Sequence, residues 1–502
     1  MLCETKGSLE SSFELTQQTK RQLTLICFGL RRFAAGIEYS IILPSVYFYL
    51  KSFNVGNYFL GLVLTADTLV AFCLSPLVQL LCEKWQRIRL LGFLANLFQI
   101  GGSMVYALSL YFYLPLVGRL ISGVGQSFSA ALYAEVKFLT SSEERGRVMI
   151  YMEGIRLFGV VIGPGMNFFV KDFDLTFGPW VIDERTAPGF FMAIVWLLIE
   201  AIHIFTVYDL RSDPKSYREL RGHDDENGTS LQLVEMKMSE VDDEQPQYVD
   251  DDKSSSKGPT EEITTMEEET GQPRQTIPII DEESFTENVD EMLPDNNSGI
   301  FKLLFKRDIM LILVCQFVMF FNQTSFEILV LLVGVNQLDF DINILSTIFI
   351  VAGVEMVAVI ILVWSANQSL DSKYLLHTSV SAGIIASFAR LAVAFSDQGS
   401  KGCLVMSILM GIFTIIGTPT ASIAGKSILP KLTHPQTHVF YQTAFATSQH
   451  LGLITGSLVT SVLYHYLIVF SSVVITVLLV VYLLLLPTVE KMKITARGCG
   501  TS

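Results

Sequence analysis

A series of apolar segments, each long enough to cross a lipid bilayer, constrains this chain more than any other feature. A helix needs about 20 apolar residues to cross ~30 Å of hydrocarbon. Half of the 502 residues are hydrophobic, and they gather in long runs. A soluble chain of this length would instead divide into domains with polar surfaces. The sequence therefore predicts an all-α protein that crosses the membrane many times.

We expect twelve transmembrane helices in two six-helix halves, separated by one long polar segment. The predicted spans are 22–50, 57–81, 90–112, 113–138, 148–170, 188–208, 308–333, 343–364, 374–396, 402–426, 437–464 and 466–486. The predicted divisions are an N-terminal tail (1–21), the first half (22–208), a loop (209–300), the second half (301–486) and a C-terminal tail (487–502).

The loop 209–300 differs from the rest of the chain in charge. It carries 26 acidic and 8 basic residues, whereas the net charge of the whole chain is −14. It has few aromatic residues and no sustained apolar period, which is typical of disorder. Within it, Tyr217 to Leu220 matches a Tyr-x-x-bulky sorting pattern, which would bind an adaptor in the cytosol.

The short loops predict the orientation of the chain. Those on the side of the N-terminus carry thirteen lysines and arginines, and those on the opposite side carry four. Lys and Arg gather in cytosolic loops, so both termini and the acidic loop are predicted to be cytosolic. The glycosylation-type sequences at Asn227 and Asn296 would then remain unmodified.

Ionisable residues inside the spans are the candidate functional residues, because each costs several kcal/mol unless it is paired or faces water. Six lie deep within spans and are candidates for binding a solute or a coupling ion: Glu38, Asp67, Arg119, Glu327, Glu355 and Arg390. Structural ion pairs are the alternative interpretation of the same residues.

Other ionisable residues in the spans favour structural roles. Four lie near predicted cytosolic ends, where they can reach water or form salt bridges: Arg31, Glu153, Arg156 and Lys426. Glu200 and His203 lie one helical turn apart and could satisfy each other or a backbone carbonyl.

Small residues in the spans predict close helix packing. They are Gly118, Gly123 and Gly125 around Arg119, and Gly159 and Gly163 in the fifth span. Pro164 should bend that span, because proline removes a helical hydrogen bond. Gly452-x3-Gly456 in the eleventh span echoes Gly159-x3-Gly163, and "EILVLL" at Glu327 echoes "EYSIIL" at Glu38. Such echoes between halves indicate duplication of a six-helix unit.

Motifs of soluble catalysis are absent from the sequence. It has no Gly-x4-Gly-Lys-Ser/Thr phosphate loop, no Gly-x-Ser-x-Gly and no His-Glu-x-x-His, which argues against an enzyme or an ATP-driven pump. The seven cysteines are scattered without metal-ligand spacing, so we expect no metal and no cofactor. The expected partners are the bilayer and a small-molecule or inorganic anion, with no nucleic acid, and the expected state is a monomer.

Arg119-x3-Gly123-x-Gly125, Gly159-x3-Gly163-Pro164 and the two halves of six spans together resemble the major facilitator superfamily. The resemblance covers nearly the whole chain outside 209–300. It implies transport by movement of one half against the other. The superfamily's gating-loop motif, Gly-x-Leu-Ala-Asp-Arg-x-Gly-Arg, is altered to "QLLCEKWQR" here. The gating-loop candidates are Glu83, Lys84, Arg87 and Arg89, with glutamine at both glycine positions.

Two further stretches resemble a lysosomal branch of this superfamily. "EYSIILPSVYFYL" (38–50) and "DERTAPGFFMAIVWLL" (183–198) are similar to the subfamily of major facilitator superfamily domain-containing protein 8 and to the related SPX-linked vacuolar transporters. No SPX domain precedes the first span, which favours the lysosomal branch. The resemblance implies an endolysosomal membrane and a small solute, anionic or chloride-like. The extended loop 171–187 would then face the lumen.

These observations lead to one preferred function and two alternatives. The preferred function is proton-coupled secondary transport by alternating access, in which Arg119 binds the anion or keeps Glu38 or Glu327 ionised until a proton arrives. The first alternative is a channel-like anion conductance lined by Arg119 and Arg390. The second is a scaffold or sensor that acts through its acidic loop.

Overall fold

The computed structural model describes residues 16–172, 175–178, 180–211, 307–369, 371–397, 399–433 and 438–498. Nine helices among these residues are long and apolar enough to cross a membrane, or ten if one bent pair is a single span. This confirms the all-α membrane fold. Tyr217, Leu220 and nearly all of the acidic loop lie outside the described residues, as do most of the N-terminal tail and the last four residues.

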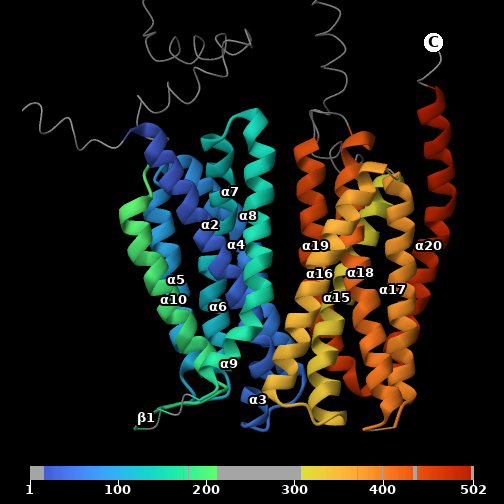
Figure 1. The fold of residues 1–502 in the computed structure, drawn as a ribbon, viewed down its shortest axis with the longest axis horizontal. Coiled ribbons are helices and arrows are strands. Elements are labelled where there is room, and N and C mark those ends of the chain that lie inside the picture. Colours follow the sequence, from blue (N-terminus) through green and yellow to red (C-terminus); the bar gives the residue numbers. More distant parts are fainter. Residues whose placement is uncertain are drawn as a thin grey trace, which may run out of the picture. The chain divides into compact units, whose positions relative to one another are not determined.

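The helices of the first half are coloured blue to green in Figure 1. They are α2 (Gln17–Ile41), α3 (Leu43–Lys51), α4 (Tyr58–Trp85), α5 (Ile88–Ala107), α6 (Leu114–Gln126), α7 (Phe128–Leu139), α8 (Ser142–Ile162), α9 (Asn167–Val170) and α10 (Ala187–Thr206). The first span is the pair α2 and α3, bent by 42°. The bend lies just before Pro44, which has no N–H to continue the helix.

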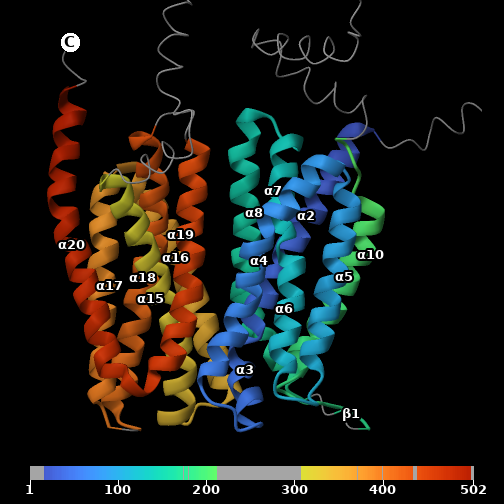
Figure 2. The ribbon, with the colours of Figure 1, turned by 180° about the vertical axis from the view of Figure 1, so that it is seen from behind.

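The helices of the second half are coloured yellow to red and are also seen from behind in Figure 2. They are α15 (Arg307–Gln337), α16 (Ile342–Ser369), α17 (Ser372–Phe395), α18 (Lys401–Leu432), α19 (His438–Leu463) and α20 (Leu467–Gly498), with the 3₁₀ turn η4 (Tyr464–Tyr466) between the last two. Several helices continue past the predicted spans, because helical hydrogen bonding does not stop where the apolar run stops.

Two spans are interrupted. The fourth, predicted as one helix over 113–138, is divided at Ser127, whose hydroxyl donates to the Val124 carbonyl at 2.5 Å. Such back-bonding by serine bends helices. In the fifth, α8 ends at Ile162 and Gly163–Met166 forms the 3₁₀ helix η1, so the helical hydrogen-bond pattern changes at Pro164. Residues 144–170 still form one candidate span, and a bend at Pro164 stays a prediction.

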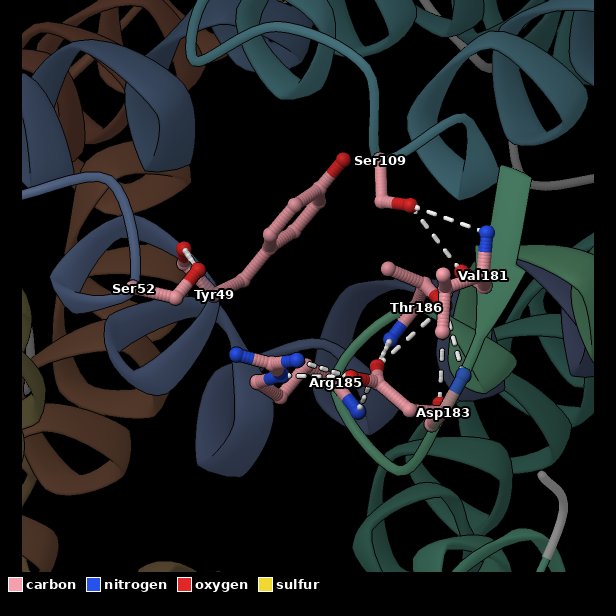
Figure 3. A network of polar contacts seen from close by, with 7 residues as sticks. All are labelled: Tyr49, Ser52, Ser109, Val181, Asp183, Arg185 and Thr186. Atoms are coloured by element: carbon pink, nitrogen blue, oxygen red, sulfur yellow. Dashed lines mark hydrogen bonds and ion pairs between the residues drawn. The ribbon is translucent and has the colours of Figure 1, made fainter. Parts of the chain in front are cut away.

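The loop 171–187 contains a β-hairpin that the sequence analysis did not predict. Strand β1 (Leu175–Phe177) pairs antiparallel with β2 (Trp180–Ile182). Figure 3 shows Ser109 donating to the Val181 carbonyl at 3.0 Å and accepting from the Val181 N–H at 3.3 Å. Asp183 accepts from the Thr186 N–H at 3.3 Å, just before α10 begins. We call the end of the helices that carries this hairpin and α3 the hairpin end, and the opposite end the tail end.

The packing of α8 on α2 recurs in the second half as the packing of α19 on α15. A Cβ atom added to Gly163 would lie 2.8 Å from the Ile37 carbonyl oxygen, and one added to Gly456 would lie 2.7 Å from that of Phe321. One turn earlier in each helix, Gly159 and Gly452 make the same kind of close contact with a carbonyl oxygen of the neighbouring helix. The glycine echo therefore marks two equivalent helix contacts.

The register of these glycine contacts corrects the second sequence similarity between the halves, that of the segments at Glu38 and Glu327. It makes Ile37 equivalent to Phe321, so Glu38 is equivalent to Asn322. Glu327 lies more than one helical turn further along α15. The predicted equivalence of Glu38 and Glu327 is wrong, because backbone contacts align the halves differently from the short letter match.

Candidate functional site

Arg119 lies on α6 between two carboxylates from two other helices. Its guanidinium donates to Asp67 of α4 and lies 3.7 Å from Oε1 of Glu38 on α2. All three side chains are less than a tenth exposed. The geometry thus brings together three of the six deep candidates, with one cation facing two carboxylates.

The glycines of the Arg119 segment place α6 close enough to its neighbours for this contact. A Cβ atom on Gly123 would lie 2.7 Å from the Asp67 carbonyl oxygen, and one on Gly118 would lie 2.7 Å from that of Gly102. Gly125 has no more room, since its Cβ would meet the Ala95 carbonyl at 2.5 Å. Their absent side chains set the helix spacing, and the spacing brings Asp67 to Arg119.

Neutral donors surround the carboxylate of Glu38. The indole Nε1 of Trp196 donates to Oε2 at 3.2 Å. The amide of Gln99 fits its surroundings when its nitrogen faces this carboxylate, 3.1 Å from Oε2 and 3.2 Å from Oε1. Oδ1 of Asp67 is buried without a hydrogen-bond partner among the described residues. The cluster is therefore one negative charge in excess when both carboxylates are ionised.

Arg31 lies deeper than predicted. It was expected to reach water or to form a salt bridge near the tail end, but only 3% of it is exposed. Its guanidinium stacks on the rings of Phe128 and Trp196 at 4.8 and 5.1 Å and donates to the Gly125 carbonyl at 2.8 Å. Ring faces and a carbonyl replace the water that the sequence analysis assumed.

Glu327 faces the first half through a hydrogen bond between the halves. Tyr39 of α2 donates to Oε2 of Glu327 at 2.8 Å, and Gln323 donates to Oε1 at 3.2 Å. Tyr39, Glu327 and Arg119 line one cavity, and the space open to the centre of a water molecule in it is about 20 Å³. That is room for one or two waters. The other lining residues are Leu43, Leu64, Thr65, Thr68, Thr324, Ile328, Leu453, Ile454 and Ser457.

Contacts between the halves close the cavity toward the hairpin end. There Tyr47 donates to Oδ1 of Asn336 at 2.9 Å. A Cβ atom on Gly61 of α4 would lie 2.7 Å from the Ser457 carbonyl oxygen of α19, so these two helices touch through their backbones. In this conformation a solute cannot enter the cavity between these contacts.

The other two deep candidates lie away from this cavity. Arg390 on α17 is 2% exposed and donates to Asn322 and Ser387, both at 2.9 Å. Its guanidinium lies 5.1 Å from the centre of the Phe470 ring. Glu355 on α16 is half-buried and is not among the residues described as lining the cavity.

Most of the residues for which the sequence favoured a structural role bond to side chains or backbone of their own half. Glu153 accepts from Arg156 and from Arg32, each at 2.8 Å, in salt bridges within the first half and not between the halves. Glu200 and His203 do not pair with each other. Glu200 accepts from Asn96 at 2.7 Å, and Nε2 of His203 lies 3.0 Å from the Arg89 carbonyl oxygen.

The altered gating loop keeps a conformation that glycine favours. Gln86, at the second glycine position of the motif, has φ of 52° and ends α4 in the left-handed region. Arg89 connects this loop to the end of the sixth span, because its N–H donates to Asp209 at 2.8 Å. Lys84 lies in the last turn of α4, and Glu83 accepts from Gln79 at 3.2 Å.

The sequence analysis missed the neutral members of the site, namely Tyr39, Gln99, Trp196 and Gln323. Each contacts a buried carboxylate. Polar side chains within apolar runs were the available signal for the two glutamines. Trp196 and Tyr39 carried no such signal, since aromatic residues are common in spans.

The Major Facilitator Superfamily sequence model matches residues 29–431 of this chain. No curated protein sequence matches it significantly. Three solved structures share its fold. The D-xylose–proton symporter is 13% identical, with a TM-score of 0.59 over 92% of this chain and 97% of that chain. The human organic anion transporter MFSD10 (TETRAN) is 14% identical, with a TM-score of 0.53 over 93% and 99%. The nucleoside transporter NupG, solved as a point mutant, is 10% identical, with a TM-score of 0.58 over 91% and 99%.

Proposed function

This chain belongs to the major facilitator superfamily, a family of transporters, and on that premise we propose that it carries a small solute across the endolysosomal membrane by proton-coupled alternating access. One observation carries the proposal. The protonatable Glu327 and the paired Arg119 border a single cavity between the two halves. Movement of one half against the other around a midplane site is how such folds transport.

The size of the cavity favours a carrier over a channel. It holds one or two waters, and the contacts of Tyr47 and Gly61 close it toward the hairpin end. A continuous pore would need an open path on both sides. Each solute would instead require the halves to separate, so turnover would be limited by that movement.

Glu327 is the proposed coupling group. When ionised, it accepts a charge-assisted hydrogen bond from Tyr39 across the interface. Charge-assisted bonds are roughly twice as strong as neutral ones. Protonation of Glu327 would weaken this link between the halves and favour separation. A proton can shift a conformational equilibrium only by binding the two states differently, and this link supplies the difference.

Arg119 has a different proposed role. Its charge is already balanced by Asp67 and Glu38, so the cluster can hold α2, α4 and α6 in a fixed arrangement at the cavity. Replacing Arg119 would leave two buried carboxylates without a cation, and replacing Glu38 would remove the contact of α2 with this cluster. We expect either change to impair transport even where the proton site on Glu327 is intact.

The endolysosomal location rests on the resemblance of residues 38–50 and 183–198, and the hairpin end would face the lumen if the termini are cytosolic. A fluorescently tagged chain should overlap with a lysosomal marker. Epitope tags at both termini should be reached by antibodies once the plasma membrane alone is permeabilised. Labelling of the plasma membrane alone would overturn the location while leaving the transport mechanism unaffected.

Purified protein in liposomes tests the coupling. An imposed pH gradient should drive solute uptake by the unaltered chain. E327Q should abolish the response of solute uptake to the gradient, whereas E355Q should behave like the unaltered chain because Glu355 is not among the residues described as lining the cavity. If E38Q, R119Q and E327Q all leave gradient-driven uptake unchanged, the mechanism is wrong.

The two alternatives have separate readouts. Currents that vary with voltage and far exceed the turnover of a carrier would indicate the anion channel. Deletion of 225–295 should spare transport in liposomes, because the residues proposed to carry transport lie in the helices of the two halves. Loss of cellular function in that deletion with normal transport would indicate the scaffold or sensor.

A further inference from the structure

We infer that the central cavity selects a cationic solute, of the class of small protonated amines, and exchanges it for protons. This inference rests on the proposed function and names its substrate class. It departs from the anionic solute that the resemblance implied and that Arg119 was expected to bind. The physical basis is the balance of charge around the cavity.

Arg119 is the single cation among the residues described as lining the cavity, and two carboxylates already balance it. Glu327 is the other ionisable acid of the lining, and its partners Tyr39 and Gln323 are both neutral. With all carboxylates ionised, the cavity region carries an excess of negative charge. An anion would be repelled there, whereas a cation would supply the missing charge.

Neighbouring charges do not reverse this balance. Arg156 and Arg32 share the carboxylate of Glu153, each at 2.8 Å, and neither is among the residues described as lining the cavity. Arg31 stacks on the indole of Trp196 and is not among the residues described as lining the cavity. Among the residues described as lining the cavity, Arg119 is therefore the only cation that shares it with Glu327.

The rest of the lining suits an ammonium group with a small apolar body. Thr65, Thr68, Thr324 and Ser457 present hydroxyl oxygens, which can accept from N–H donors. Thr65 is only 3% exposed, and its hydroxyl has no hydrogen-bond partner among the described residues. A hydroxyl without such a partner can accept from an N–H donor that enters the cavity. The aliphatic lining residues would cover the carbon skeleton.

Competition at Glu327 determines the direction of coupling. The ionised carboxylate can bind an ammonium group as an ion pair, but the protonated form offers no charge. Each proton that binds Glu327 therefore displaces the cation, and each cation that binds excludes the proton. The two should move in opposite directions across the membrane.

Matched solutes test the inference in liposomes that are acidic inside. The first pair, putrescine and succinate, shares a four-carbon skeleton, and the second pair, tyramine and 4-hydroxyphenylacetate, shares a phenol ring. The amines should enter faster than they enter protein-free liposomes and should raise the internal pH, while the carboxylates should not move. E327Q should lower amine exchange by about 30-fold or more, because it removes one partner of a buried charge pair. E327D should retain part of the exchange, and E355Q all of it.

The outcomes separate the inference from the proposed function. Gradient-driven movement of succinate or 4-hydroxyphenylacetate with no movement of amines would overturn the cationic class and leave proton-coupled transport standing. Amine movement in the same direction as protons would overturn the exchange. Failure of every solute to move, with folded protein, would overturn both.

Discussion

Replacing Gly123 with alanine tests whether helix spacing holds the buried ion pair together. The added Cβ would lie 2.7 Å from the Asp67 carbonyl oxygen and 2.7 Å from Cβ of Val70, whereas ordinary contacts lie at 3.4–4 Å. Both neighbours are close to the α4 backbone and cannot rotate away. The methyl group must therefore push α4 and α6 apart at the residue that binds Arg119.

The expected size follows from two opposing effects. Overpacking of this kind costs about 1–3 kcal/mol, and exchanging glycine for alanine inside a helix stabilises by about 1 kcal/mol. G123A should therefore lose up to about 2 kcal/mol of the free energy of unfolding. Gly101 on α5 is the matched control, because an added Cβ there meets no atom within 4 Å. G101A should gain up to about 1 kcal/mol.

Thermal unfolding of the purified variants in one detergent measures the difference. The midpoint of G123A should fall below that of the unaltered chain, and that of G101A should equal or exceed it. Solute exchange in liposomes should fall in G123A alone, because Asp67 moves with α4. Equal midpoints for the two variants would show that α6 does not depend on this close approach, and the proposed origin of the Arg119 pair would be refuted.

Three further changes test other contacts. D67N should destabilise the protein by about 3–5 kcal/mol, because it breaks the direct ion pair and leaves the buried guanidinium only with Glu38 at 3.7 Å. E38Q should cost less, because the closer pair of Arg119 and Asp67 remains. Equal unfolding midpoints for D67N and the unaltered chain would contradict this ranking. Y47F should weaken the closure at the hairpin end by about 0.5–1.5 kcal/mol, because it removes the hydrogen bond to Asn336. A cysteine introduced at Ser457 should then react faster with a thiol reagent applied from the hairpin end. An unchanged reaction rate would exclude a closing role for Tyr47. G456A and G163A should both lower the unfolding midpoint, because the two glycines meet equivalent carbonyl oxygens. G154A on α8 should not lower it, because an added Cβ there meets no atom within 4 Å. An effect of the glycine substitution in one half alone would argue against equivalent contacts.

Local features of the sequence were sufficient for the fold class and for the most important residue of the site. The apolar runs predict spans because the length needed to cross a bilayer is a property of a single helix. Arg119 stands out for a similar reason, since a charge within an apolar run requires a partner wherever the helix lies. The glycines around it predict close packing without specifying which helix approaches.

The local sequence could not predict which residues pair with one another between helices. Glu38, Glu327 and Glu355 look alike in sequence, each a lone carboxylate in an apolar run. Their environments differ because of how each helix is rotated and how closely it packs. Glu38 meets Arg119, Glu327 meets Tyr39 from the other half, and Glu355 lies apart from both.

The sequence by itself determined that this is a membrane protein of paired helical halves with a charge buried near Arg119. Hydropathy and residue size act along one helix and can be read there. The tertiary structure alone decided that two carboxylates face the guanidinium of Arg119, and that Glu327 borders the cavity with neutral hydrogen-bond partners. Those facts depend on distances between helices, which backbone contacts at a few glycines fix.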